Sequence, residues 1–198
     1  SLVITIGYDI IEYAPAKWHI NKADIIHIDT MPADINKNYQ PQIEVVGNIN
    51  DSLTRIMKKA ARLQEPKIFL DIRKRMVEEH ESYAQDTSFP VKPQKALIDC
   101  RRVMDKDDIV ISDVGANKVW IARHYNCYKP NTCLISNGFA TMGIAVPGAI
   151  AAKLVHPDKK VLAITGDAGF MMNCQEFETA HRLGTNFVTL IFYDHSYG

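Results

Sequence analysis

The feature that most constrains the fold is the alternation of short apolar runs with segments of helical periodicity. Runs with the length and composition of β-strands lie at residues 2–6, 24–28, 43–46, 108–112, 161–165 and 187–192. Residues 49–63 place their apolar side chains on one face of a helix. Strands that alternate with helices form mostly parallel sheets covered on both faces. We therefore predict an α/β fold of parallel sheets flanked by helices.

A change in composition divides the chain. Residues 65–90 are rich in charge and end in a Phe-Pro break, which is typical of a helix followed by a linker. We expect a front domain over 1–64, this helix and linker over 65–90, and a second domain over 91–198. The chain begins without Met inside an apolar run and ends shortly after another, so we expect it to be part of a longer polypeptide.

Composition excludes some classes of function. Apolar residues make up 46% of the 198 residues, enough for a core, and 23 basic residues balance 23 acidic ones. Zero net charge argues against nucleic-acid binding and against a polybasic membrane surface. The sequence contains no signal peptide and no apolar run of 18 residues, so we expect a soluble, cytoplasmic protein.

Two aspartates that follow apolar runs suggest a site. Asp167 and Asp194 are 27 residues apart, the length of one strand–helix–strand repeat, with a helix expected over about 173–183 and a stop at Gly184. A right-handed crossover brings both strand ends to one sheet edge, where open α/β sheets bind ligands. Carboxylates suit Mg²⁺ or Ca²⁺ far better than zinc, and small residues beside a helix expected to start near residue 171 suit a diphosphate. One aspartate alone would more simply cap a turn, but the shared edge favours a metal–diphosphate site.

These residues resemble the thiamine-diphosphate enzymes. Gly166-Asp167-Ala168, followed by Tyr193-Asp194, is similar to the cofactor motif of that family, with Ala168 in place of its usual third Gly and Tyr193-Asp194 in place of Asn-Asn. The segments SDVGANKVWIARHY (112–125), SNGFATMGIAVPGAIAAKLVHPDKKV (136–161), ITIGYDIIEYAPAKWH (4–19) and YQPQIEVVGNI (39–49) resemble acetolactate synthases, most closely the catabolic type. The resemblance implies part of a Rossmann-like middle domain followed by part of the thiamine-diphosphate-binding fold.

The resemblance also implies a set of site residues. Mg²⁺ would be bound by Asp167, Asp194 and the backbone carbonyl of Ser196. Met142 would lie beneath the cofactor and hold its two rings in a V, while Ala140 and Met142 hold the aminopyrimidine edge. Met142 could alternatively be a core residue of a helix over 140–152. The complete set of implied cofactor-binding residues is Gly115, Ala116, Asn117, Ala140, Met142, Gly166, Asp167, Ala168, Gly169, Asp194, Ser196 and Tyr197.

The implied activity is the condensation of two pyruvates to 2-acetolactate with release of CO₂, with thiamine diphosphate and Mg²⁺ as cofactors and FAD not required. The activating glutamate of such enzymes is expected outside this chain, which alone is predicted inactive, and a homo-oligomer is expected. Alternatives are another thiamine-diphosphate-dependent 2-oxoacid decarboxylase or oxidase, and a non-catalytic module with a decayed site. A nicotinamide or flavin domain over 1–50 is less favoured, because GYDIIEY lacks the G-x-G-x-x-G spacing.

Overall fold

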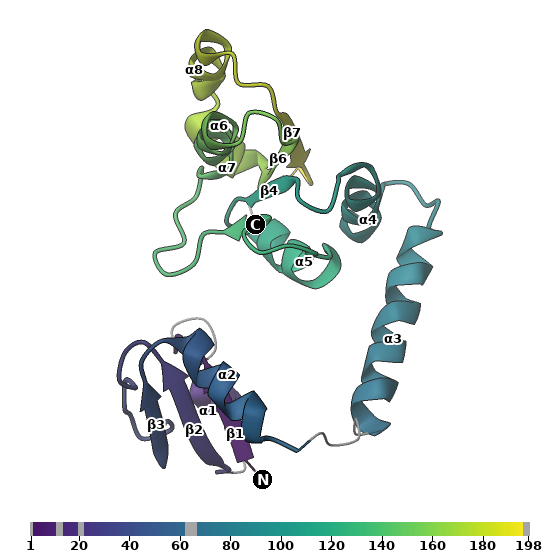
Figure 1. Cartoon of the computed structure of the whole chain (residues 1–198). Helices are drawn as coiled ribbons and strands as arrows, with labels where there is room; N and C mark the ends of the chain where they lie inside the picture. Colours follow the sequence, from purple (N-terminus) through teal and green to yellow (C-terminus); the bar gives the residue numbers. More distant parts are fainter. Residues whose placement is uncertain (1, 11–13, 20–21, 62–66, 196–198) are drawn as a thin grey trace. The chain divides into compact units, whose positions relative to one another are not determined.

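The computed structural model describes residues 2–10, 14–19, 22–61 and 67–195 (Figure 1). The chain divides into two compact units, Ser1–Glu65 and Pro66–Gly198. The predicted boundary after residue 64 lies outside the described residues. Each unit is an α/β structure, and every pairing between its strands is parallel, as predicted.

The first unit is a sheet of strand order β1-β2-β3, formed by β1 (Leu2–Ile6), β2 (Asp24–Asp29) and β3 (Ile43–Val46). Helix α1 (Pro15–Trp18) lies between β1 and β2, and α2 (Ile49–Lys59) follows β3. A polar contact is buried in this unit, where the Tyr39 hydroxyl lies 2.6 Å from Thr5 Oγ1 and 2.8 Å from Nδ1 of His27. Helix α2 ends at Lys59, earlier than the predicted 63, because Ala60 takes an extended conformation.

The second unit begins with the helix expected between the domains. Helix α3 (Lys67–Ala84) contacts α4 (Pro93–Val103) and belongs to this unit. An ion pair of 2.8 Å between Glu79 and Arg123 also joins α3 to α5 (Ala116–His124).

The sheet of the second unit has the strand order β5-β4-β6-β7. Its strands are β4 (Ile109–Ser112), β5 (Cys133–Ile135), β6 (Val161–Gly166) and β7 (Val188–Phe192). The sequence indicated β4, β6 and β7 but not β5. That strand has only three residues, too few to show an apolar periodicity.

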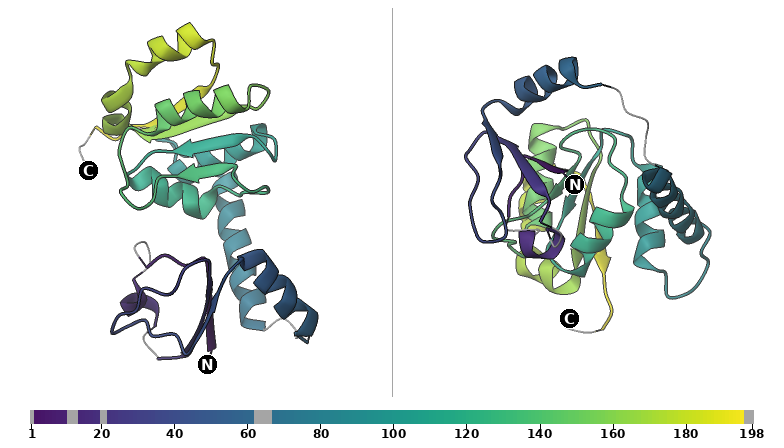
Figure 2. Two further views of the ribbon diagram at one scale, coloured as in Figure 1. Left: turned by 60° about the vertical axis from the view of Figure 1, so that its left-hand side comes forward. Right: turned by 90° about the horizontal axis from the view of Figure 1, so that it is seen from below.

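Helices cover both faces of this sheet (Figures 1 and 2). Alternate residues of a strand point to opposite faces, so Ile109 and Ile111 of β4 pack with α6 (Ala145–Val155) while Val110 packs with α4 and α5. The two faces therefore have separate cores. One contains Ile109, Ile111, Ala145, Ala149, Ala152, Val161 and Ala163, and the other Leu97, Val110, Ile121, Tyr125, Leu162 and Ile164.

The helix after β6 starts earlier than predicted. In place of one helix starting near residue 171, α7 (Asp167–Asn173) begins directly after β6, and α8 (Glu176–Leu183) follows after two further residues. The two glycines of GDAG have poor helix propensity, which is why these residues suggest a loop when the sequence is considered alone. Gly184 ends α8 as predicted, with a φ of 65° and its N–H directed to the carbonyls of Ala180 and His181.

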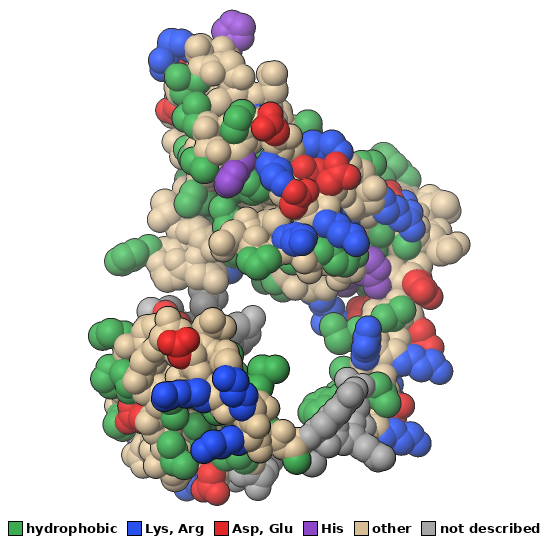
Figure 3. All heavy atoms as spheres, in the orientation of Figure 1, with side chains coloured by type: hydrophobic (Ala, Val, Ile, Leu, Met, Phe, Trp, Pro, Cys, Tyr) green, Lys and Arg blue, Asp and Glu red, His purple; other side chains and the backbone are tan. Residues whose placement is uncertain are grey.

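The surface carries charges of both signs. Lysine and arginine side chains are interspersed with acidic ones on the face shown in Figure 3. Of the helices in the described part of the chain, none combines the length and the apolar content that crossing a membrane requires.

Candidate functional site

The candidate site lies at the carboxyl edge of the second sheet. The chain runs from β4 to β5 on one side and from β6 to β7 on the other, so adjacent strands β4 and β6 lead in opposite directions. Such a reversal opens a crevice between the two strand ends, and open α/β sheets bind their ligands there. The loop after β4 contains Gly115, and the residues after β6 begin at Asp167.

The register of β6 and β7 brings the two predicted aspartates to this edge. Gly166 pairs with Phe192, the last residue of β7. Asp167 is therefore one residue beyond the end of its strand and Asp194 two residues beyond the end of the next. This level ending is the arrangement that the 27-residue spacing predicts.

Gly166 and Asp167 leave room for a ligand. A Cβ added at Gly166 would meet nothing within 4 Å, so another group can approach the backbone at this point. Asp167 is half-buried and occupies the first turn of α7, where a negative charge is favoured by the helix dipole. Its Oδ1 accepts a hydrogen bond of 2.7 Å from the N–H of Ala168, while Oδ2 accepts none from the described residues.

Gly169 has a different environment. It is buried, and an added Cβ would lie 2.8 Å from Thr165 Oγ1 and 3.1 Å from both Cγ and Oδ1 of Asp113. The missing side chain therefore lets α7 pack closely on the ends of β4 and β6.

The residues after β4 point in two directions. Gly115, with a φ of 136°, and Ala116 are exposed at the start of α5. Asn117 is buried, and its amide donates to the carbonyls of Asp113 at 2.9 Å and Ile164 at 3.4 Å. The Asn117 side chain thus joins β4 to β6, and an approach of this residue to a diphosphate stays a prediction.

Ala140 and Met142 lie in the non-helical segment 136–144 between β5 and α6. Ala140 has a φ of 48°, a conformation that residues with a side chain seldom adopt. Met142 is half-buried and precedes Gly143, whose φ is 84°. Helix α6 begins only at Ala145, so Met142 is not a core residue of a helix. The contacts predicted for both residues stay predictions.

Two polar residues that the sequence did not indicate hold this segment in place. Asp113 accepts hydrogen bonds from the backbone N–H groups of Val114, Gly143 and Ala145. The Asn173 side chain of α7 donates to the carbonyl of Gly143 at 2.8 Å. A signal for Asp113 was present, since it follows an apolar strand directly, as Asp167 does.

At the end of β7 the chain stays exposed. The rings of Tyr193 and His195 are 4.4 Å apart between centroids, and Asp194 lies between them in sequence. His195 has a φ of 63°. Two predicted site residues, Ser196 and Tyr197, lie outside the described residues.

Among the described residues of the second unit, the groups whose pKa is shifted lie away from this edge. Burial raises the pKa of Tyr125 to about 12 and lowers the pKa of His124. Both residues are at the far end of α5 from Gly115, and so at the opposite edge of the sheet from the predicted site. Their shifts follow from packing and give no indication of catalysis.

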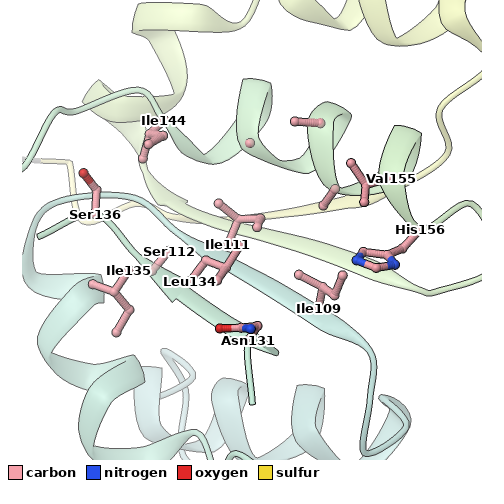
Figure 4. A pocket seen from close by; sticks show the side chains of 13 residues that line it. Ile109, Ile111, Ser112, Asn131, Leu134, Ile135, Ser136, Ile144, Val155 and His156 are labelled. Carbon is pink, nitrogen blue, oxygen red and sulfur yellow. The ribbon is translucent and has the colours of Figure 1, made fainter. Parts of the chain in front are cut away.

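A hollow of about 420 Å³ lies between β4, β5 and α6 (Figure 4). Its walls are mainly apolar, including Ile109, Ile111 and Leu134, with Asn131 and His156 at one end. None of the predicted site residues that the structure describes lines it. We therefore assign the candidate site to the carboxyl edge of the sheet.

Comparison with known families agrees with this position. Residues 113–198 match the sequence model described as "Thiamine pyrophosphate enzyme, C-terminal TPP binding domain", and residues 1–56 match "Thiamine pyrophosphate enzyme, central domain". The chain belongs to the thiamine pyrophosphate enzyme family. Thiamine pyrophosphate is thiamine diphosphate, so the resemblance of the motif at 166–168 is confirmed at the level of the family. Strands β5, β6 and β7 of the second unit lie within the part matched to the cofactor-binding domain, and β4 ends directly before it.

Relatives within the thiamine pyrophosphate enzymes carry a narrower name. The chain is 38% identical to "Acetolactate synthase" from Bacillus subtilis and 36% identical to "Acetolactate synthase, catabolic" from Raoultella terrigena. Each alignment covers 100% of the chain, and 35% and 36% of the two relatives. A third relative, "Probable acetolactate synthase large subunit" from Methanococcus aeolicus, is 35% identical over 92% of the chain and 33% of its own length. The chain thus spans about a third of the length of these relatives.

Proposed function

We propose that the second unit binds thiamine diphosphate with Mg²⁺ in the crevice between the ends of β4 and β6. One observation carries this proposal. The ends of β6 and β7 are level, which brings Asp167 and Asp194 to the same edge as the open backbone at Gly166. The match of residues 113–198 to a cofactor-binding domain supports it independently.

The described residues fit the cofactor. Mg²⁺ prefers oxygen ligands and is often held by one or two carboxylates together with phosphate oxygens. Oδ2 of Asp167 accepts no hydrogen bond from the described residues, and Asp194 would supply the second carboxylate. The diphosphate would lie against the backbone of Gly115 and Ala116 on one side and of Gly166 and Ala168 on the other. All four residues are half-buried or exposed, so the backbone can be approached.

We further propose that the complete protein is an acetolactate synthase that condenses two pyruvates to 2-acetolactate and releases CO₂. The names of the relatives support this reaction. The bound cofactor supplies a nucleophilic carbon that adds to the keto group and accepts the electrons released with CO₂. In this chain Asp167 and Asp194 hold the metal, and Ala140 and Met142 orient the aminopyrimidine ring. We also propose that the complete protein does not require FAD, that it assembles as a homo-oligomer and that it is cytoplasmic.

Thermal unfolding of the chain with different ligands tests the cofactor. A ligand present at 100 times its dissociation constant stabilises the folded state by about 2.7 kcal/mol. We expect this increase with thiamine diphosphate plus Mg²⁺, and none with FAD or NAD. Stabilisation by FAD or NAD alone would favour a different cofactor domain, and no stabilisation by any of them would favour a non-catalytic module with a decayed site or an incomplete site in this chain.

The reaction is tested in the complete protein by a colorimetric assay for acetoin, which forms from acetolactate after acid treatment. We expect acetolactate from pyruvate in the presence of thiamine diphosphate and Mg²⁺. Consumption of pyruvate without acetolactate would favour another 2-oxoacid decarboxylase or oxidase of the family.

A further inference from the structure

The Asp113 carboxylate lies at the point where three segments of the candidate site meet. It follows β4 directly, and only 1% of the residue is exposed. Oδ1 accepts hydrogen bonds from the N–H of Val114 at 2.7 Å and of Gly143 at 2.8 Å. Oδ2 accepts one from the N–H of Ala145 at 3.1 Å. Gly169 of α7 packs against the same carboxylate.

Gly143 is held from two sides. Its N–H donates to Asp113, and its carbonyl accepts from the Asn173 amide. A Cβ at this position would come within 2.6 Å of Asn173 Nδ2 and 3.0 Å of Met172 Cβ, so no other residue fits without a shift. Residue 142 is bonded directly to this fixed point. The position of Met142 therefore depends on the Asp113–Gly143–Asn173 contacts.

We propose that Asp113 is a positioning residue of the cofactor site. It fixes segment 136–144, with Ala140 and Met142, relative to the ends of β4 and α7. This inference rests on the proposed function, because it concerns the placement of residues that would contact the cofactor. Asp113 itself has both oxygens occupied by backbone N–H groups and does not need to touch a ligand.

The chemistry of the side chain explains why a carboxylate is needed. Both oxygens of a carboxylate accept hydrogen bonds, whereas one end of an amide only donates. In Asp113→Asn the amide nitrogen must face either the N–H of Gly143 and Val114 or that of Ala145. At least one buried backbone donor, that of Gly143 or that of Ala145, loses its acceptor, so the junction between segment 136–144 and α6 is held less firmly.

The same strand offers a matched control. Asp108, just before β4, is 3% exposed, and its carboxylate accepts from the N–H of Asp105 at 2.6 Å and of Lys160 at 2.9 Å. It is a buried carboxylate at the opposite edge of the sheet that likewise accepts from backbone N–H groups, and it also lies 3.8 Å from the Lys160 ammonium. Asp108→Asn therefore reproduces the loss of a buried acceptor without altering the candidate site.

Two measurements on the 198-residue chain test the proposal. Amide hydrogen exchange, measured by mass spectrometry without ligand, follows the peptide that spans 138–145. Isothermal titration measures the dissociation constant for thiamine diphosphate with Mg²⁺. For Asp113→Asn we expect faster exchange in that peptide and a dissociation constant raised about 10- to 100-fold, the size of effect seen for groups that orient metal ligands. Asp108→Asn should lower the melting temperature and leave both quantities near the parental values.

Asn173→Ala removes the hydrogen bond from the Asn173 amide to the carbonyl of Gly143. It provides the test of the proposal if Asp113→Asn does not fold. Asn173→Ala should also raise the exchange rate of the peptide and the dissociation constant, by less than Asp113→Asn does. The proposal is overturned if Asp113→Asn exchanges like the parent, or if its exchange rises while its affinity stays at the level of Asp108→Asn. If the parent chain binds no cofactor, the proposed cofactor binding by this chain is refuted. If the parent binds the cofactor but Asp113→Asn exchanges like the parent, only the role of Asp113 is refuted.

Discussion

Gly166 and Gly169 belong to one short motif, but the structure predicts opposite consequences for replacing each with alanine. A Cβ at Gly166 enters open space, and the φ of −83° and ψ of 172° at this position are allowed to alanine. Gly166→Ala should therefore change stability by no more than about 1 kcal/mol, since alanine restricts the unfolded chain but is a poorer N-cap for α7 than glycine. If a diphosphate approaches the backbone there, the new methyl group occupies its place and weakens binding by at least about tenfold, or 1.4 kcal/mol.

Gly169→Ala should act on stability. The new Cβ would lie 2.8 Å from Thr165 Oγ1 and 3.1 Å from Asp113 Cγ. Neither group can easily move, because Thr165 is fully buried and Asp113 accepts three backbone hydrogen bonds. Overpacking of this kind costs about 2–3 kcal/mol, and the better helix propensity of alanine offsets about 1. The net loss of about 1–2 kcal/mol lowers the melting temperature by roughly 3–10 °C.

Thermal unfolding of the free chain and titration with thiamine diphosphate plus Mg²⁺ separate the two effects. The expected result is a stable Gly166→Ala with weakened binding, and a Gly169→Ala that is less stable before any ligand is added. Parental affinity in Gly166→Ala would refute the approach of the diphosphate to this backbone. Parental stability in Gly169→Ala would show that α7 does not pack as closely as the structure indicates.

Three further outcomes are expected. Asp194→Asn should bind thiamine diphosphate with Mg²⁺ as well as the parent or better in titration, because it retains an oxygen ligand and removes a charge near the diphosphate; much weaker binding would contradict its place beside the metal. Met142→Ala should leave the dissociation constant near parental and lower the turnover of the complete enzyme, since the proposed role of this half-buried side chain is to orient the cofactor; equal losses in both would contradict this role. Because burial lowers the pKa of His124 from its ordinary value of 6.5, the unfolded state takes up a proton more readily, so the free energy of unfolding should fall as pH drops below about 6.5. Urea unfolding at pH 7.5 and 5.5 should show a smaller fall in His124→Phe, and an equal fall would show that His124 is not the group responsible.

Patterns within single segments predicted most of the strands and the edge where the site lies. The positions of β4, β6 and β7, and the level ends that carry Asp167 and Asp194, follow from apolar runs and from the length of one crossover. Such patterns are local, and they are read from composition and spacing alone.

The parts that the sequence did not indicate depend on contacts between distant segments. Helix α6 starts at Ala145 because the left-handed conformations of Ala140 and Gly143 break the helical path, and the hydrogen bond from Gly143 to Asp113 spans 30 residues. The inward position of the Asn117 side chain likewise depends on its hydrogen bond to the carbonyl of Ile164, 47 residues away. Neither contact leaves a periodic signal in the sequence.

The account depends most on Asp167 as a ligand of Mg²⁺ that carries the diphosphate. The direct measurement is titration of the chain with thiamine diphosphate at rising Mg²⁺, comparing the parent with Asp167→Ala and with Glu178→Ala, which removes an exposed acidic side chain of α8. We predict Mg²⁺-dependent binding in the parent and in Glu178→Ala, and its loss in Asp167→Ala. Binding in Asp167→Ala with parental affinity and the same dependence on Mg²⁺ would contradict the account.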